Sequence, residues 1–164
     1  MKKLWLLLIV MVLLPGCGQT TYEGREAPCG SQSVEAVPGV ISICATDDMS
    51  MPVMSTQEGN RFYIADHYEV SLQTMAGGDI DETLKSCTGF DRSRLMVIQT
   101  QKDGLARYDC AWTSVGEEGQ HVGRTTILDD GNFHYVLTIT GQEGEELAAA
   151  WKQLSDSFTI SIVQ

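Results

Sequence analysis

The strongest constraint on the fold is a run of four strand-like stretches in the second half of the chain. Each is rich in β-branched or aromatic residues, and they cover residues 95–100, 105–115, 121–128 and 133–140. Two of the turns between them contain an Asp-Gly pair, Asp103-Gly104 and Asp130-Gly131. Such a pair adopts the positive φ angles of tight hairpins, so consecutive stretches are expected to pair antiparallel. The run therefore predicts a four-stranded meander at the centre of the fold.

Three shorter strands and a helix are predicted ahead of the meander. The strands cover residues 40–45, 61–65 and 68–75. The helix begins after Asp79, which can cap free N–H groups while Glu82 completes a capping box, and it stops by Gly89. Its apolar face consists of Ile80, Leu84 and Cys87.

After residue 140 the apolar period changes from two residues to about 3.6, which predicts an amphipathic helix. Its apolar stripe is Leu147, Ala150, Trp151, Leu154 and Phe158. Thr140 and Glu143 are predicted to form the capping box, and residues 159–163 a final short strand. The order of elements predicts the α+β class, with an antiparallel β-sheet and helices packed on it. We expect a single domain over residues 39–164.

The first residues have the pattern of an export signal. Met1-Lys2-Lys3 is positive, residues 4–14 are apolar, and the run is too short to span a bilayer as a helix. The stretch Leu14-Pro15-Gly16-Cys17 that follows resembles the bacterial lipobox. The resemblance implies cleavage before Cys17 and attachment of lipid to its sulfur, so residues 1–16 are interpreted as a lipoprotein signal peptide. The alternative is an ordinary signal peptide with a chance cysteine.

Residues 17–38 contain few large apolar side chains and are predicted to be a lipidated tether. Two or three acyl chains on Cys17 would hold the protein at a membrane, where one chain alone anchors only marginally. We therefore expect an extracytoplasmic location, anchored to the cell membrane or envelope.

The charge of the chain limits its partners. Removing residues 1–16 takes away Lys2 and Lys3 of the 11 basic residues and leaves 22 acidic ones, a formal charge of −13 on 148 residues. Such a charge argues against nucleic acid and against binding to anionic lipid headgroups. A chain of 148 residues is enough for one domain with a sizeable core.

Four cysteines remain if Cys17 carries lipid: Cys29, Cys44, Cys87 and Cys110. An even number in an exported domain predicts two disulfides, and counting alone leaves three connectivities open. Cys87 lies near the end of the short predicted helix, and Cys110 alternates with Tyr108 and Trp112 on one face of a strand. If that helix covers that face, Cys87 and Cys110 can meet. We predict the pairs Cys87–Cys110 and Cys29–Cys44.

A cluster of methionines raises the sharpest chemical question. Met49, Met51 and Met54 lie within six positions, in the stretch DDMSMPVM. Thioethers are soft ligands that select Cu(I), and the spacing resembles the methionine motifs of copper-handling proteins. Methionine is also a flexible filler of irregular apolar gaps. Because the stretch contains no histidine or cysteine, packing is preferred and Cu(I) handling is the alternative function.

Motifs of enzymatic chemistry are not found in the sequence. It contains no Gly-x-Ser-x-Gly elbow, no Cys-x-x-Cys and no His-x-x-x-His pair. His67, His121 and His134 are far apart in the sequence and are interpreted as surface or sheet-edge residues. We therefore predict no catalytic residues, no cofactor and no enzymatic activity.

The order of elements resembles a known family. The most specific parts are YVLTIT, residues 135–140, and WKQLSDSF, residues 151–158, in which a buried tryptophan is expected. They resemble the PsbP-like fold of photosystem PsbP proteins and bacterial DcrB-like lipoproteins, over roughly residues 40–163. The resemblance implies an α/β/α sandwich and a non-enzymatic accessory or binding module. The expected function is that of an envelope lipoprotein with an unknown protein partner, in envelope assembly, transport or stress.

Overall fold

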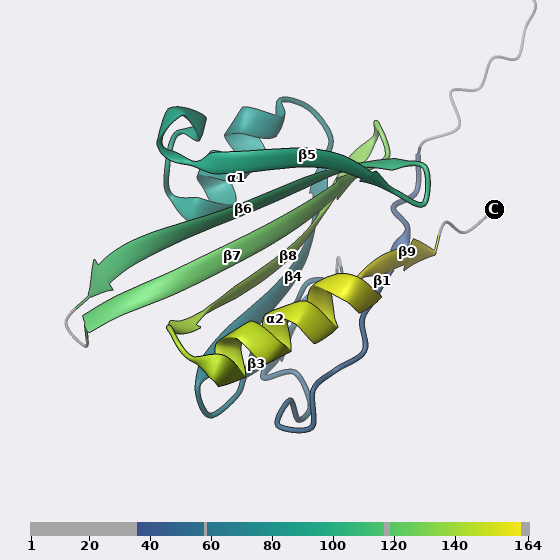
Figure 1. The fold of residues 1–164 in the computed structure, drawn as a ribbon. Helices are drawn as coiled ribbons and strands as arrows, with labels where there is room; N and C mark the ends of the chain where they lie inside the picture. Colours follow the sequence, from purple (N-terminus) through teal and green to yellow (C-terminus); the bar gives the residue numbers. More distant parts are fainter. Residues whose placement is uncertain (1–35, 58, 117–118, 162–164) are drawn as a thin grey trace, which may run out of the picture. The chain divides into compact units, whose positions relative to one another are not determined.

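The computed structural model describes residues 36–57, 59–116 and 119–161. Its main element is a seven-stranded antiparallel sheet in the order β2-β3-β4-β8-β7-β6-β5, seen in Figure 1. The first three strands are β2 (Met54–Ser55), β3 (Arg61–Ile64) and β4 (Tyr68–Ala76). The other four are β5 (Met96–Lys102), β6 (Leu105–Gly116), β7 (Gly119–Asp129) and β8 (Phe133–Gln142). The predicted antiparallel meander is therefore confirmed.

The strand register assigns each side chain to one of two faces, because alternate residues of a strand point to opposite sides. Leu128 of β7 lies opposite Tyr135 of β8, and Leu137 lies opposite Leu72 of β4, so these residues share one face. Ile127 and Val136 are paired on the other face. Both faces are buried in the centre of the sheet, which explains why β8 is apolar at nearly every position.

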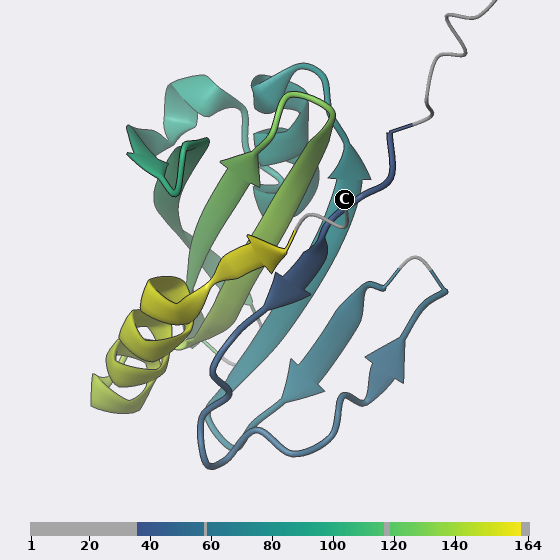
Figure 2. The ribbon, with the colours of Figure 1, turned by 90° about the vertical axis from the view of Figure 1, so that its right-hand side faces the viewer.

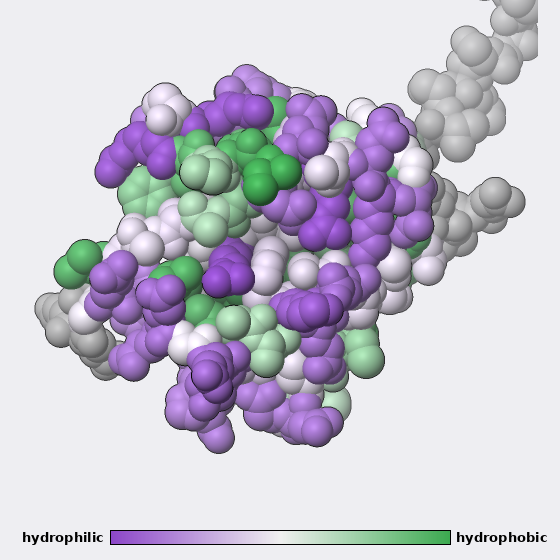
Figure 3. Space-filling model, viewed as in Figure 1, coloured by the Kyte–Doolittle hydropathy of each residue, from purple (hydrophilic) through white to green (hydrophobic). Residues whose placement is uncertain are grey.

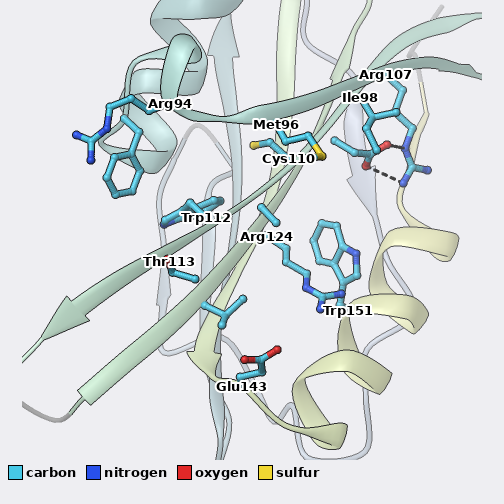
Figure 4. Close-up of a pocket in the computed structure, with 14 residues that line it drawn as sticks. Arg94, Met96, Ile98, Arg107, Cys110, Trp112, Thr113, Arg124, Glu143 and Trp151 are labelled. Carbon is cyan, nitrogen blue, oxygen red and sulfur yellow. Dashed lines mark hydrogen bonds and ion pairs between the residues drawn. The ribbon is translucent and has the colours of Figure 1, made fainter.

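Helix α2 (Glu145–Ser157) covers the face that contains Tyr135 and Leu137. Leu147, Leu154 and the following Phe158 are each at most 2% exposed in that core. Trp151 was expected to be buried there as well, but it is only half-buried at the margin of the core. The reason is that Trp151 lines a groove over the part of the sheet that the helix leaves uncovered, as Figure 4 shows.

Helix α1 (Ile80–Thr88) covers the opposite face, where Leu84 packs with Ile127 and Val136. The Asp79 half of the predicted capping box is confirmed, since its side chain accepts a hydrogen bond from the backbone N–H of Asp81. Among the described residues, Glu82 makes no hydrogen bond back to Asp79. Gly89 ends the helix in the left-handed region at φ 78°. A short 3-10 helix, η2 (Arg92–Arg94), leads into β5.

The predicted capping box of α2 is wrong. Thr140 is still paired in β8, opposite Glu69, so it is not at the helix start. The N-cap residue is Gly144, which makes no side-chain cap hydrogen bond. Glu145 and Glu146 lie in the first turn, where their charge complements the helix dipole.

A second, two-stranded sheet pairs β1 (Val40–Ser42) with β9 (Thr159–Ser161). Figure 2 shows these two strands side by side near the end of α2. A buried hydroxyl, that of Tyr135, accepts a hydrogen bond from the N–H of Gly39 (2.8 Å) and donates one to Asp130 (2.7 Å). This hydroxyl therefore connects the start of β1 to the β7–β8 turn.

The α+β class with a dominant antiparallel sheet is confirmed by this architecture. Within the described residues, no helix is long and apolar enough to cross a membrane. The predicted signal peptide at residues 1–16, the predicted lipid site Cys17 and most of the predicted tether lie outside the described residues.

Candidate binding groove

A groove of about 810 Å³ lies on the α2 face of the sheet, over the part that α2 leaves uncovered. It runs from Trp151 and Glu143, beside α2, across β7 and β6 to Met96 at the start of β5. Figure 4 shows this arrangement, and Figure 3 shows apolar surface over the same side of the molecule. The groove exists because β5 and β6 extend the sheet beyond the width that one helix can cover.

The groove opens through a gap in the edge of the sheet. Strand β5 begins at Met96, which pairs with Ala111, whereas β6 continues to Gly116. In the described part of the chain, no strand pairs with residues 112–116 on the side of β5. Phe90 and Arg94, which precede β5, line the groove at this gap.

Aromatic side chains form two of its walls. The Trp112 indole covers Gly123, whose missing side chain makes room for it, because a Cβ there would lie 2.2 Å from the ring. The guanidinium of Arg94 lies 4.9 Å from the centre of the Phe90 ring, a cation–π contact. Figure 4 shows Trp151 on the other side of the groove from Trp112 and Arg94.

The arginines of the groove differ in their partners. Arg107 forms two hydrogen bonds with Asp109, at 2.7 and 2.9 Å, so its charge is neutralised locally. Arg124 is half-buried and points toward Trp151 in Figure 4. Among the described residues, the Arg124 guanidinium makes no hydrogen bond or ion pair, although Glu143 lines the same groove.

The lining is therefore suited to binding an amphipathic anion. Three arginines and two acids line it, and Asp109 is already paired with Arg107. In a chain of net charge −11 this is a locally basic surface. Its apolar walls supply contact area, and a guanidinium can bind a carboxylate through two parallel hydrogen bonds.

Arg124, Trp112 and Trp151 were not identified as site residues from the sequence. In strand β6 the odd-numbered residues lie on the groove face, whereas the Tyr108, Cys110, Trp112 series that the sequence showed lies on the α1 face. Trp112 nevertheless lines the groove, next to the gap in the sheet edge where β5 has not yet begun. The sequence did not show which part of the groove face is covered by α2. That depends on the angle and position at which α2 crosses the sheet.

The three predicted metal-ligand methionines differ in their burial. Met49 is 7% exposed and packs in the α2-side core, as the packing interpretation expects. Met51 and Met54 do not pack in this way, since they are 83% and 56% exposed. A Cu(I) site formed by all three would require Met49 to leave the core.

The predicted disulfide between Cys87 and Cys110 is not formed. Both are free thiols in the α1-side core, and Cys87 Sγ contacts Met75 Sδ at 4.0 Å. Burial raises the pKa of Cys87 to about 11, and burial with the nearby Cys87 raises that of Cys110 to about 11. Cys44 is an exposed free thiol, and its predicted partner Cys29 lies outside the described residues.

The histidines do not converge on one site. His134 was expected at the surface, but it is 1% exposed and its Nδ1 is 2.7 Å from Thr83 Oγ1. This bond joins α1 to β8 and explains how a polar ring is accommodated in the core. His67 and His121 line a second hollow of about 370 Å³ beside the β3–β4 turn. In the described ranges, no cluster of histidine, cysteine and acidic residues is arranged to hold a metal ion.

Comparison with known proteins adds little to this picture. No protein-family model and no curated protein matches the chain. A crystal structure at 1.50 Å of a protein from Bacteroides thetaiotaomicron VPI-5482 aligns with a TM-score of 0.45 and 12% identity. The alignment covers 76% of this chain and 49% of that protein, so this chain spans about half of its length. A similarity of this size supports no argument about function.

Proposed function

We propose that this protein is a membrane-anchored lipoprotein of the cell envelope whose single domain is a non-enzymatic binding module. The lipid on Cys17 attaches the chain to the membrane, and the domain binds a protein partner outside the cytoplasm. The domain belongs with the PsbP-like and DcrB-like proteins in this proposal, as an α/β/α arrangement used for binding rather than catalysis.

The observation that carries the binding role is the groove beside α2. It combines exposed apolar side chains with an arginine that has no partner in the described residues, which is the composition of a recognition surface. The location rests on the apolar run that ends at Leu14-Pro15-Gly16-Cys17. The helices on opposite faces of the sheet are consistent with the PsbP-like arrangement.

The anchor is tested by fractionating cells that express the full chain or its Cys17→Ala variant. We expect the unaltered protein in the membrane fraction, with acyl mass on an N-terminal Cys17, and the variant released or retained with its signal peptide uncleaved. A mature N-terminus at Gly18 or later, without acyl mass, would refute the lipoprotein assignment. Gly18→Ser is the matched control, since it changes the neighbouring residue and leaves the acylated sulfur in place.

A further inference from the structure

We infer that the groove binds an extended, acidic segment of a partner protein, which adds as a short strand beside β6 at Thr113 and Val115. The inference rests on the proposed function and deepens it, because it names the class of partner that the binding module recognises. It depends on the free edge of the sheet, on the exposed apolar side chains beside that edge and on the local charge.

The free edge follows from the register of β5 and β6. Asp103 and Gly104 form a two-residue turn with φ values of 53° and 82°. The residues flanking such a turn, Lys102 and Leu105, exchange hydrogen bonds, and every second pair along the ladder does the same. The odd-numbered residues of β6 therefore direct their backbone N–H and C=O groups toward β5.

Beyond Ala111 there is no β5 residue to receive these groups. Thr113 and Val115 thus present two N–H and two C=O groups at an open edge of the described sheet. An extended peptide can satisfy all four by adding as a strand in line with β5. The groove reaches this position, because Thr113, Phe90 and Arg94 are all part of its lining.

The side chains around this edge are apolar and unusually exposed. Val115 is 86% exposed and Met96 is 79% exposed, and both belong to the groove face of the sheet. Edge strands are normally protected by lysine, proline or bulges against pairing with other chains. Residues 111–115, AWTSV, have none of these protections, which is expected of an edge that pairs with a partner.

Charge distinguishes the possible partners. Arg124 lies on the next strand, in the row of Ala111 and Met96, and Arg94 lies at the gap. A carboxylate on the added strand would give Arg124 the partner that it lacks in the described residues. A second copy of this chain would instead bring its own Arg94 and Arg124 toward those of the first, and like charges across an interface are unfavourable. The occupant is therefore an acidic segment of another protein.

The experiment selects peptides on the purified full-length chain, held in nanodiscs if it carries lipid and free in solution if it does not, with a phage-displayed library of random eight-residue peptides. We expect enrichment of peptides with alternating β-branched or apolar residues and at least one Asp or Glu. The enriched peptide is then synthesised and its affinity measured by fluorescence anisotropy. Replacing its acid by Lys should weaken binding at least tenfold, as should methylating the backbone nitrogens that face β6.

Two variants test the backbone and the charge separately. Thr113→Pro removes the outward N–H, which an edge strand tolerates, while Thr113→Val keeps it. We expect at least tenfold weaker binding to Thr113→Pro and to Arg124→Gln, and unchanged binding to Thr113→Val. The circular dichroism spectrum should be the same for all three variants and the unaltered chain.

The inference is overturned if no peptide is enriched, if enriched peptides lack an acid, or if they bind Thr113→Pro as tightly as the unaltered chain. Binding of anionic lipid vesicles that depends on Arg124, with no peptide binding, would also overturn it. Because Cys17→Ala leaves the groove unchanged, failure of the anchor and failure of peptide binding are independent results.

Discussion

The Trp112 indole lies against Gly123 on the neighbouring strand, so closely that a Cβ on Gly123 would be 2.2 Å from ring atom Cε2. We expect Gly123→Ala to displace the indole and to lower the free energy of unfolding by about 1–3 kcal/mol, the usual range for overpacking. Urea denaturation measures the change. Gly78→Ala is the control, because a Cβ there has nothing within 4 Å, and it should stay within about 0.5 kcal/mol.

The same measurement can show whether the loss of stability comes from a clash with the Trp112 indole or from an effect of alanine on the backbone at position 123. In a Trp112→Leu background, the smaller side chain leaves room for a Cβ at position 123. The penalty of Gly123→Ala should then shrink by at least half, as a double-mutant cycle would report. An undiminished penalty would show that the indole is not the group in conflict.

The buried hydroxyl of Tyr135 is expected to contribute to stability. Tyr135→Phe removes a hydrogen bond donated by Gly39 and one donated to the Asp130 carboxylate. We expect a loss of about 1.5–3 kcal/mol, the range for a hydrogen bond to a charged group. Tyr108→Phe, whose hydroxyl has only a 3.5 Å contact with Gln99, should lose less than about 0.5 kcal/mol. Equal losses in both variants would contradict this account.

We expect the stability that Tyr135 contributes to depend on pH in the alkaline range. Burial raises the pKa of Tyr135 to about 12, and a hydrogen bond to Asp130 adds to the effect, whereas the unfolded value is about 10. The neutral phenol is favoured in the folded state, so its stabilisation is complete below pH ~10 and is lost as the pH rises through about 12. The difference in melting temperature between the unaltered protein and Tyr135→Phe should therefore narrow above pH ~10. If the difference in melting temperature between the two proteins stays constant from about pH 8 to about pH 12, the raised pKa of Tyr135 is refuted.

The cysteines are predicted to differ in their reaction with iodoacetamide at about pH 8, just below the ordinary thiol pKa. Cys44 is exposed and should be alkylated rapidly, while Cys87 and Cys110 should react only after unfolding. Cys110 is buried and Cys87 is half-buried, and desolvation raises the pKa of both thiols to about 11, which leaves little thiolate at that pH. Peptide mapping by mass spectrometry measures each site. Recovery of a Cys87–Cys110 disulfide from the native protein, instead of two thiols, would contradict the structure.

Two methionines of the DDMSMPVM stretch offer a matched pair. Met49→Ala should destabilise the domain by about 2–3 kcal/mol, because it empties a buried position. Met51→Ala should change the stability by less than about 0.5 kcal/mol, since Met51 is 83% exposed. In a Cu(I) competition titration we expect no affinity tighter than micromolar. A tighter site that is lost in the Met49/Met51/Met54→Leu variant would support the copper hypothesis instead.

Local pattern was enough to predict most elements of the sheet and one complete helix. The Asp103-Gly104 turn has the positive φ angles that were expected, and Asp79 and Gly89 end α1 as their chemistry predicts. These features depend on neighbours within a few residues, so the sequence contains the information directly. The class of fold follows from the same patterns, because period and turn chemistry specify which segments are strands.

The sequence by itself determined the meander and the Asp79 and Gly89 ends of α1, while the export signal at residues 1–17 stays a prediction. Only the tertiary structure decided that β4 pairs with β8, that Trp151 stays at the margin of the core, and that Arg124 faces an open groove. Each of these depends on contacts between segments far apart in the chain. Alternation tells which residues share a face, but the position of α2 decides which part of that face is covered. The candidate site lies in the part that is left uncovered.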